Sequence, residues 1–353
     1  MVRWRGEVSA TGRRATVHDV AREAGVSLAT VDRVLNNRPG VRPRTVEKVE
    51  QAIASLDYRR DLSASLLARA RDLRVKFLLP DGSNEFMDSL AEAVNRRANP
   101  LLAERVGIQI LRFRALNPFA LAKAIDGLEP NDCDCAVVVA TSHEAVAQAI
   151  DGAHRRGIAI MTLVSDLPQS QRRLFIGIDN TAAGKTAASL IGRFCKRGKV
   201  GLIIGSLALR DHRERLDGFR SVCEAEFPDL ELIGPLESQD EPQATEQLVR
   251  NLLSQHPDLV GLYNLGAGNA GLLSGLEAAA RAGEVRVIAH ELSESTREGL
   301  RTGAIDVVLD QHPDREIAAA IEAARSLALS TRDPVGAVVS PIEIGVFLRD
   351  NLR

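Results

Sequence analysis

The first 60 residues carry the hydrophobic spacing of short helices. Thr16 can cap a helix over 17–24, and Ser27 can cap a second helix that runs to about Asn36. After a loop with two prolines, apolar residues recur at helical spacing over 45–56 and predict a third, amphipathic helix. The pattern therefore predicts a compact three-helix unit whose first two helices meet at a glycine turn.

The second of these helices has two different faces. With about 100° of rotation per residue, one face takes the apolar residues Val31, Val34 and Leu35. The opposite face takes Leu28, Ala29, Asp32, Arg33 and Asn36. We expect the apolar face in the core of the unit and the other face against a partner. Any helical hairpin can show this pattern, so the two faces alone do not identify the partner.

From Arg74 onward, short apolar runs alternate with helical stretches and with Gly/Pro punctuation. The runs are VKFLLP, GIQILRF, CAVVVAT, GIAIMTLVS, RLFIGI, KVGLIIGS, LVGLYNLG, VRVIAHE and DVVLDQ. Runs this apolar favour parallel strands covered on both faces, with ligands bound at the carboxyl ends of the strands. The length of this region is sufficient for two doubly wound lobes.

Composition and charge narrow the class of protein. The chain of 353 residues is 45% hydrophobic and 26% charged, which is typical of a globular protein. No apolar run reaches the roughly 18 residues of a membrane span, and residues 1–19 lack the apolar core of a secretory signal. We therefore expect a cytoplasmic protein.

The charge is unevenly distributed. Residues 1–70 hold 13 Lys and Arg against 8 Asp and Glu, a net charge of +5, whereas the remainder carries −7. A cationic module on an anionic body indicates a polyanionic partner, since neutralising phosphates releases counterions.

Several patterns argue against a metal, a cofactor or catalysis. Cys133-Asp-Cys135 has no second ligand pair at metal spacing, and the scattered cysteines are expected to be reduced. Gly184-Lys185-Thr186 resembles part of a phosphate-binding loop, but Asp179 stands where that loop needs glycine. H-E-x-x-H and G-x-S-x-G are absent from the sequence. We therefore expect no metal, no cofactor and no catalytic residue.

The run ATVHDVAREAGVSLATVDRVLNNRPGVRPRTVEKVEQAIASLDY closely resembles the DNA-binding domain of the LacI/GalR family of transcriptional regulators. The family pattern is roughly T-x-x-D-V-A-x-x-A-G-V-S-x-x-T-V-S-R-V-L-N, matched without gaps from about Thr16 to Tyr58. The resemblance implies a helix-turn-helix whose second helix enters the major groove of double-stranded DNA. It implies base reading by Leu28, Ala29 and Arg33, and phosphate contacts by His18, Ser27, Thr30 and Asn36, with Thr16 also in the DNA-binding set.

Asp32 stands where the family pattern has serine, on the face expected against DNA. Two interpretations stay open. The carboxylate can accept a hydrogen bond from a cytosine amino group, or it can repel a phosphate and lower non-specific affinity.

The family continues with Pro-Asn and a hinge helix that orders on the operator, whereas this chain has Arg60 and Asp61. Leu67 falls on the register of the apolar wedge that enters the minor groove, although a plain linker helix with packed leucines stays open. We expect a flexible basic segment over 1–14, the helix-turn-helix over 15–60 and the hinge over 61–73.

Residues 74–353 resemble the effector domain of the same family, which is similar to periplasmic sugar-binding proteins. The implied fold class is a small all-α domain followed by α/β, with two Rossmann-like lobes of the type I periplasmic-binding-protein fold. Expected crossovers near 176–179, 310–311 and 335–341 give an N-lobe of about 74–176 and 311–335 and a C-lobe of about 177–310 and 336–353. In the family the N-lobe forms the dimer interface, which implies a homodimer on a pseudo-palindromic operator.

Six side chains at the ends of expected strands are predicted to meet a ligand in the cleft: Asn84, Phe86, Arg215, Asn269, Glu291 and Gln311. Arg215 lies in RERLDGF, which matches the R-x-x-G-F pattern of the family, and Gln311 matches its hinge glutamine. Asn269 and Glu291 depart from the family pattern. A sugar, a sugar acid, a polyol and an amino-bearing ligand therefore stay open.

The expected function is sequence-specific DNA binding by a transcriptional regulator, a repressor, controlled by a small sugar-like effector. The alternatives are the same architecture with a co-repressor ligand, a sugar-binding protein without DNA regulation, and a sugar-processing enzyme.

Overall fold

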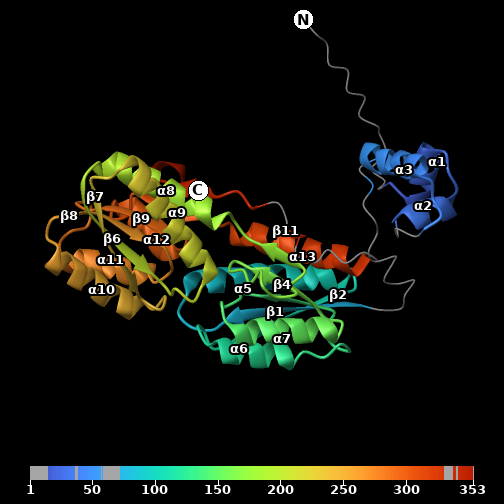
Figure 1. Cartoon of the computed structure of the whole chain (residues 1–353), viewed down its shortest axis with the longest axis horizontal. Helices are drawn as coiled ribbons and strands as arrows, with labels where there is room; N and C mark the ends of the chain where they lie inside the picture. Colours follow the sequence, from blue (N-terminus) through green and yellow to red (C-terminus); the bar gives the residue numbers. More distant parts are fainter. Residues whose placement is uncertain are drawn as a thin grey trace, which may run out of the picture. The chain divides into compact units, whose positions relative to one another are not determined.

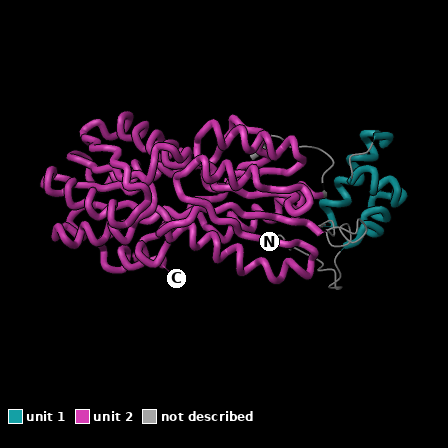
Figure 2. Tube along the Cα trace, turned by 90° about the horizontal axis from the view of Figure 1, so that it is seen from below, with its two compact units in different colours: residues 1–71, 329–333 teal, residues 72–328, 334–353 magenta. Residues whose placement is uncertain are grey.

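The computed structural model describes residues 15–35, 39–56, 58, 72–329, 337–338 and 341–352. The chain forms two compact units, residues 1–71 with 329–333 and residues 72–328 with 334–353 (Figure 2). Asn36, Leu67 and the expected segments 1–14 and 61–71 lie outside the described residues.

The first unit contains the three predicted helices, α1 (Val17–Ala24), α2 (Leu28–Leu35) and α3 (Pro43–Ser55). Thr16 and Asp19 form a capping box at the start of α1, and Gly25 ends it with a left-handed φ of 64°. The helix α3 begins two residues earlier than expected, because the fixed φ of Pro43 suits the first helical turn. The fully buried Val20, Val31 and Val49 form the centre of the core.

The N-lobe is a parallel sheet with the strand order β11-β5-β4-β3-β1-β2. Its strands are β1 (Leu73–Pro80), β2 (Val106–Phe113), β3 (Cys135–Val138), β4 (Ala159–Leu163), β5 (Leu174–Ile176) and β11 (Ala337–Val338). The helices that cover it are α5 (Glu85–Leu102), α6 (Pro118–Asp126), α7 (Glu144–Arg155) and α13 (Pro313–Leu329). In Figure 1, α5 and α13 lie on one face of the sheet and α6 and α7 on the other.

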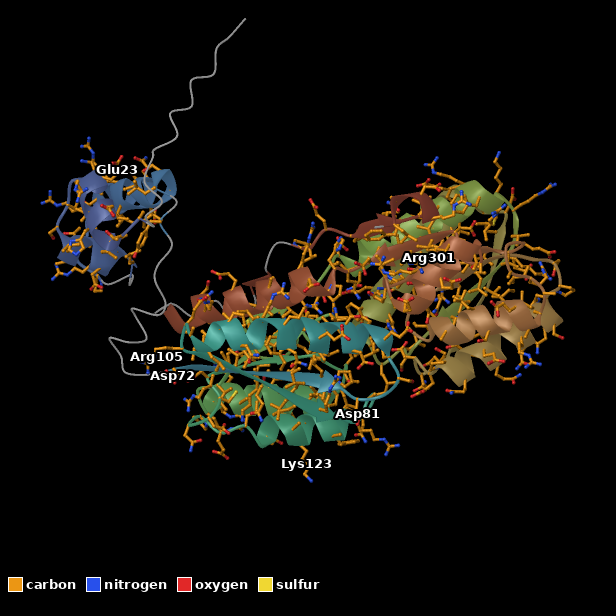
Figure 3. The ribbon with its side chains drawn as sticks, turned by 180° about the vertical axis from the view of Figure 1, so that it is seen from behind. Glu23, Asp72, Asp81, Arg105, Lys123 and Arg301 are labelled. Carbon is orange, nitrogen blue, oxygen red and sulfur yellow. The ribbon has the colours of Figure 1, made fainter. Side chains whose placement is uncertain are left out.

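Ion pairs fix the outer parts of this lobe. Asp314 at the start of α13 accepts from Arg96 and Arg97 of α5, at 3.0 and 2.7 Å. Arg105 and Asp72 lie together at the amino end of the sheet, with 2.6 Å between Nε and Oδ1 (Figure 3).

The C-lobe has a second sheet with the order β12-β10-β9-β8-β6-β7. Its strands are β6 (Gly198–Ile204), β7 (Leu230–Glu237), β8 (Leu259–Asn264), β9 (Arg286–His290), β10 (Val307–Asp310) and β12 (Gly345–Phe347). Its helices are α8 (Asn180–Cys195), α9 (Arg210–Glu226), α10 (Pro242–Gln255), α11 (Asn269–Ala278) and α12 (Glu294–Thr302), with a short 3-10 helix at Arg349–Asn351. One core packs α8 and α9 against the sheet, and another packs α10, α11 and α12 against its other face.

The architecture confirms the expected fold class, but the structure corrects several details. The strand β11 pairs with β5, so the N-lobe extends beyond residue 335 and the C-lobe does not begin at 336. A strand of two residues is too short to leave a hydrophobic pattern. The strand β1 begins at Leu73, inside the segment expected as hinge.

Two C-lobe strands also differ from the expectation. The sequence pattern did not predict β7, because only the first residue of this edge strand is buried and the strand contains Gly234-Pro235. The strand β12 runs antiparallel to β10, whereas only parallel strands were expected. Antiparallel pairing is common at the edge of an otherwise parallel sheet.

Candidate functional site

The outward face of α2 is the candidate surface for reading DNA. Val31 is completely buried, whereas Leu28, Ala29, Asp32 and Arg33 are exposed. Leu28 is 41% exposed, which leaves its apolar side chain available to a thymine methyl group. The structure thus gathers the described members of the predicted base-reading face on one side of one short helix.

The residues predicted at phosphates lie around the starts of α1 and α2. His18 is exposed. The Thr16 hydroxyl accepts from the Asp19 amide at 3.3 Å, which caps α1, and donates to the Asp19 carboxylate at 2.6 Å. The Ser27 hydroxyl accepts from the Thr30 amide at 3.2 Å and lies 2.9 Å from the Thr30 hydroxyl. These threonine and serine hydroxyl groups form the hydrogen bonds that cap the helices, so any phosphate contact they make is in addition to that capping role.

The two α/β lobes are closed on each other. Hydrogen bonds across the cleft join Ser83 Oγ to Glu241 Oε2 at 2.8 Å, Ser295 Oγ to Glu85 Oε1 at 2.7 Å, Arg213 Nη2 to Ser142 Oγ at 2.8 Å and the Arg210 amide to Ser165 Oγ at 3.1 Å. Each pair has one partner in each lobe. Opening the cleft would break all of these bonds, so they stabilise the closed form.

The closed cleft contains a polar cavity at the carboxyl ends of the strands. Its polar lining consists of Asn84, Ser165, Asp211, His212, Arg215, Asp240, Glu291 and Gln311. Asp81, beyond the tip of β1, lines another cavity at the same edge of the N-lobe (Figure 3). This is the position where parallel α/β sheets bind ligands.

Arg215 is the most deeply buried charge in the cavity wall. Its side chain is 1% exposed, and Nε donates to Asn180 Oδ1 at 2.9 Å. Its Nη1 donates to the Leu265 carbonyl at 2.8 Å and lies 3.6 Å from Glu291 Oε1. Its Nη2 has no hydrogen-bond partner among the described residues. Arg215 can therefore donate hydrogen bonds from Nη2 to a ligand in the cavity that it lines.

A close helix contact holds Arg215 in place. Gly184 lies inside α8, where a Cβ would overlap the carbonyl group of Arg215. Gly218 of α9 is similarly packed against the carbonyl group of Thr181. The Gly-Lys-Thr sequence at 184–186 is thus explained by helix packing, because it lies in the middle of a helix instead of in a loop.

Glu291 and Gln311 face each other beside this arginine. Gln311 Nε2 donates to Glu291 Oε1 at 2.6 Å. Within the described part of the chain, Glu291 Oε2 and Gln311 Oε1 have no partner. Burial raises the pKa of the Glu291 carboxyl to about 8, although Arg215 and the Gln311 hydrogen bond both lower it.

Strained backbone also marks the cavity. Glu291 holds a left-handed φ of 69°, and the β-branched Val164 holds one of 64°. Each of these conformations costs about 1–3 kcal/mol in a residue other than glycine. Both residues follow the end of a strand, where the strain directs the chain around the cavity.

The remaining predicted ligand residues have structural partners too. Asn84 caps α5 by accepting from the Phe86 and Met87 amides, and its Nδ2 lies 3.5 Å from Asp240 Oδ2 in the other lobe. Phe86 lines the polar cavity with 5% of its surface exposed.

Asn269 does not line the polar cavity but lines a second cavity that adjoins it. Its amide accepts from Asn264 at 2.8 Å and donates to the His290 carbonyl at 3.0 Å. Asn269 therefore holds two strand ends together at the wall of the adjoining cavity, which Glu291 and Phe86 also line.

The sequence interpretation missed three charged or titratable lining residues: Asp211, His212 and Asp240. Asp211 precedes Arg215 by one helical turn on α9, and this spacing could have revealed it. Asp240 follows β7, which was not predicted. The sequence also did not indicate the buried hydrogen bond between Tyr263 Oη and His290 Nε2, which are 2.7 Å apart.

The other candidate chemistry is structural. Cys133 and Cys135 are free and buried, and burial raises the pKa of the Cys133 thiol to about 11. Among the described residues, no cluster of three or more His, Cys, Asp or Glu side chains is placed to hold a metal ion. No helix in the described ranges is long and apolar enough to cross a membrane.

The paired lobes define the class of two-lobed periplasmic-type binding proteins. An ABC transporter solute-binding protein from Burkholderia graminis C4D1M, in complex with D-arabinose, shares this fold with a TM-score of 0.73 at 23% identity, covering 80% of this chain and 97% of that one. GanP, a glucose-galactose binding protein from Geobacillus stearothermophilus, has a TM-score of 0.71 at 19% identity, covering 80% and 99%.

Family comparison places both parts of the chain. Residues 75–331 match the periplasmic binding protein domain, and residues 16–61 match the bacterial regulatory proteins of the lacI family. The chain therefore belongs to the periplasmic binding protein domain family and carries the DNA-binding domain of the lacI family.

Regulators are among the curated relatives. The HTH-type transcriptional regulator DegA of Bacillus subtilis (strain 168) is 28% identical over 215 residues, which cover 60% of this chain and 61% of DegA. Catabolite control protein A of Priestia megaterium is 39% identical over 118 residues, covering 32% of this chain and 35% of that protein. The chain thus spans less than two thirds of the length of either relative.

Proposed function

We propose that this protein is a cytoplasmic transcriptional repressor that binds a pseudo-palindromic operator as a homodimer and responds to a small, sugar-like effector. The proposal rests on one observation: the same chain has a DNA-reading helix face and a ligand cavity. One is the exposed face of α2, with Arg33 and Leu28 opposite a buried Val31. The other is a buried cavity with unsatisfied hydrogen-bonding groups.

The chemistry of the cavity supports a hydroxyl-rich effector. Arg215 offers a donor, Gln311 offers an acceptor and the Glu291 carboxyl offers either, depending on its protonation, and all three are at least 95% buried. Buried polar groups without a partner are costly, so a ligand with several hydroxyl groups would stabilise the closed form. The sugar ligands of the solved relatives agree with this class of effector.

Closure of the cleft supplies the regulatory step in this proposal. A ligand that binds only the closed form shifts the equilibrium between open and closed lobes by its difference in affinity. In a dimer, that motion would change the spacing of the two DNA-binding units and hence operator affinity, by about 1–3 kcal/mol.

The proposal for DNA is tested by selecting binding sites from random duplexes with the full-length protein. We expect a two-fold symmetric consensus, and we expect Arg33→Ala to lose preference at one base pair of each half-site, worth about 1–3 kcal/mol. Arg22→Ala is the matched control, because Arg22 is an exposed arginine on α1 outside the α2 face. Undiminished selectivity in Arg33→Ala would contradict the assignment of α2.

Asp32→Ser separates the two interpretations of that carboxylate. If Asp32 reads a cytosine, the substitution relaxes one operator position; if it only repels phosphate, it raises affinity for random DNA and leaves selectivity unchanged. Fluorescence anisotropy with operator and scrambled duplexes at two salt concentrations distinguishes these results.

A thermal-shift screen of sugars, sugar acids and polyols tests the effector, since a ligand that binds the folded state raises its Tm. Adding each hit to the DNA-binding assay then gives the sign of regulation. Release of the operator identifies an inducer, and tighter binding identifies a co-repressor. A protein that binds sugars but selects no DNA sequence would be a sugar-binding protein without DNA regulation.

A further inference from the structure

The polar cavity has more acidic than basic side chains in its wall. The carboxyl groups of Asp211, Asp240 and Glu291 line it, whereas Arg215 is the cation among the residues described around it. His212 adds no charge in this arrangement, because its Nδ1 accepts a hydrogen bond from the Ser206 amide at 3.3 Å and so carries no proton. Once Glu291 is ionised, the wall of the cavity therefore favours a ligand with positive charge.

The groups without a partner show the same imbalance. Among the described residues around the cavity, the unpartnered acceptor atoms are Asp211 Oδ1, Glu291 Oε2 and Gln311 Oε1, and the unpartnered donor is Arg215 Nη2. These four side chains are at most 5% exposed. When the Glu291 carboxyl is ionised, a ligand that satisfies the three acceptor atoms must supply a donor to each of them.

A further acidic side chain belongs to the same cluster. Glu316 of α13 is completely buried, and neither of its oxygens has a partner in the described chain. It interacts electrostatically with Glu291, Arg215, Asp310 and Asp211. Burial raises the pKa of the Glu316 carboxyl well above its ordinary value, so this group, which does not line the cavity, is held neutral beside it.

We infer that the effector carries a protonated amino group among its hydroxyls, and that Asp211, Glu291 and Gln311 accept its N–H donors. This inference rests on the proposed use of the cavity as the effector site. An ammonium group supplies three donors, no acceptor and one positive charge, whereas each hydroxyl group of a neutral sugar supplies one donor and no charge. A sugar acid would add another anion to the cluster, so this class is disfavoured.

Binding of such a ligand is coupled to protons. Burial keeps the Glu291 carboxyl protonated to a pH of about 8, and an adjacent ammonium group favours its ionised form. The charged and titratable groups around Glu291 are Asp211, His212 and Arg215 of α9, Asp240 after β7, His290 of β9, Asp310 of β10 and Glu316 of α13. At pH 7, binding should therefore release a proton to the solvent, and affinity should rise with pH as long as the amino group of the ligand stays protonated.

The test uses matched ligands on the full-length protein. Each polyol is offered in a neutral, an amino and an acid form: glucose, glucosamine and glucuronate; galactose, galactosamine and galacturonate; sorbitol, glucamine and gluconate. We expect at least one amino member to bind at least tenfold more tightly than its neutral and acid partners in titration calorimetry. Equal or weaker binding of every amino member, or binding of none, overturns the inference.

Variants locate the effect. Glu291→Gln should weaken the best amino ligand at least tenfold and abolish proton release, measured by repeating the titration in buffers of different ionisation enthalpy. Glu214→Gln is the matched control, since Glu214 pairs with Arg210 at 2.6 Å and does not line this cavity. Circular dichroism checks that both variants fold. Unchanged amino affinity and proton release in Glu291→Gln would overturn the assignment.

Failure of this inference is distinguishable from failure of the proposed function. If site selection yields a symmetric operator and a neutral sugar or sugar acid shifts its binding, the regulatory function stands and the amino ligand is wrong. If no DNA sequence is selected, the regulatory function is wrong, while the amino preference is still decided by calorimetry.

Discussion

Glu291 predicts how the stability of the ligand-binding unit depends on pH. Its carboxyl has a pKa of about 8 in the folded chain because it is buried, against an ordinary value of 4.5. The folded state therefore holds this proton to a higher pH than the unfolded chain does. The stability from this group is fully present below pH 4.5 and falls as the pH rises to about 8.

The structure sets the size of this effect. One pKa unit is worth about 1.4 kcal/mol, so the whole interval corresponds to roughly 5 kcal/mol. Glu291 lines a cavity, and relaxation of its surroundings reduces this figure, so we expect a loss of about 2–4 kcal/mol between pH 5 and pH 9. Glu291→Gln keeps the shape and the acceptor for Gln311 but cannot ionise. Its advantage over the original chain should therefore grow by that amount across this range.

Urea unfolding followed by circular dichroism at pH 5, 6, 7, 8 and 9 measures the difference. Glu231→Gln serves as the control, because Glu231 is exposed on β7, and its curve should run parallel to that of the original chain. If Glu291→Gln also runs parallel over the whole range, then Glu291 ionises in the folded chain as freely as in the unfolded chain, and the reasoning is refuted.

Three further predictions concern packing, capping and thiol reactivity. Gly184→Ala should lower the free energy of unfolding by about 1–3 kcal/mol, because its Cβ overlaps the Arg215 carbonyl. Gly152→Ala in α7 should raise the free energy of unfolding by up to about 1 kcal/mol, because its Cβ meets only the ends of the Arg156, Arg155 and Asp126 side chains, at 3.4 Å or more. Effects of equal sign in urea unfolding would contradict this. Thr16→Ala should speed amide hydrogen exchange over 17–24, because it removes a helix cap worth about 1 kcal/mol. Thr16→Ser keeps the capping hydroxyl and should leave the exchange rates unchanged. Equal exchange rates in the two variants would exclude the cap. At pH 7.5 the three buried thiols, those of Cys133, Cys135 and Cys223, should react slowly with Ellman's reagent in the folded chain and rapidly in urea. The reason is that burial raises the pKa of each thiol. Fast reaction of the folded chain would contradict this prediction by showing that these thiols are accessible.

The DNA-binding unit could be predicted from the sequence, because its determinants are local. The capping box of Thr16, the glycine at the end of α1 and the spacing of Val31, Val34 and Leu35 act within a few residues. The apolar runs of the central strands are similarly self-contained. Short or half-exposed strands such as β7 and β11 gave no such signal, because their existence depends on the neighbouring strand.

The ligand site could be predicted only in part. Motif positions and strand ends indicated Arg215, Glu291 and Gln311, and the structure brings these three together at the cavity. The sequence could not indicate which polar atoms remain without a partner there. That property depends on contacts such as Asn84 to Asp240, which lie 156 residues apart in the chain.

The sequence by itself therefore determined the two-part organisation, the fold class and the helix expected to read DNA. Only the tertiary structure decided that the cleft is closed, that acidic side chains outnumber basic ones in its wall and that Glu316 of another helix lies buried in the same cluster. The physical reason is that helix caps and hydrophobic spacing are short-range, whereas burial, electrostatic potential and unsatisfied hydrogen bonds arise from groups that folding brings together from distant parts of the chain.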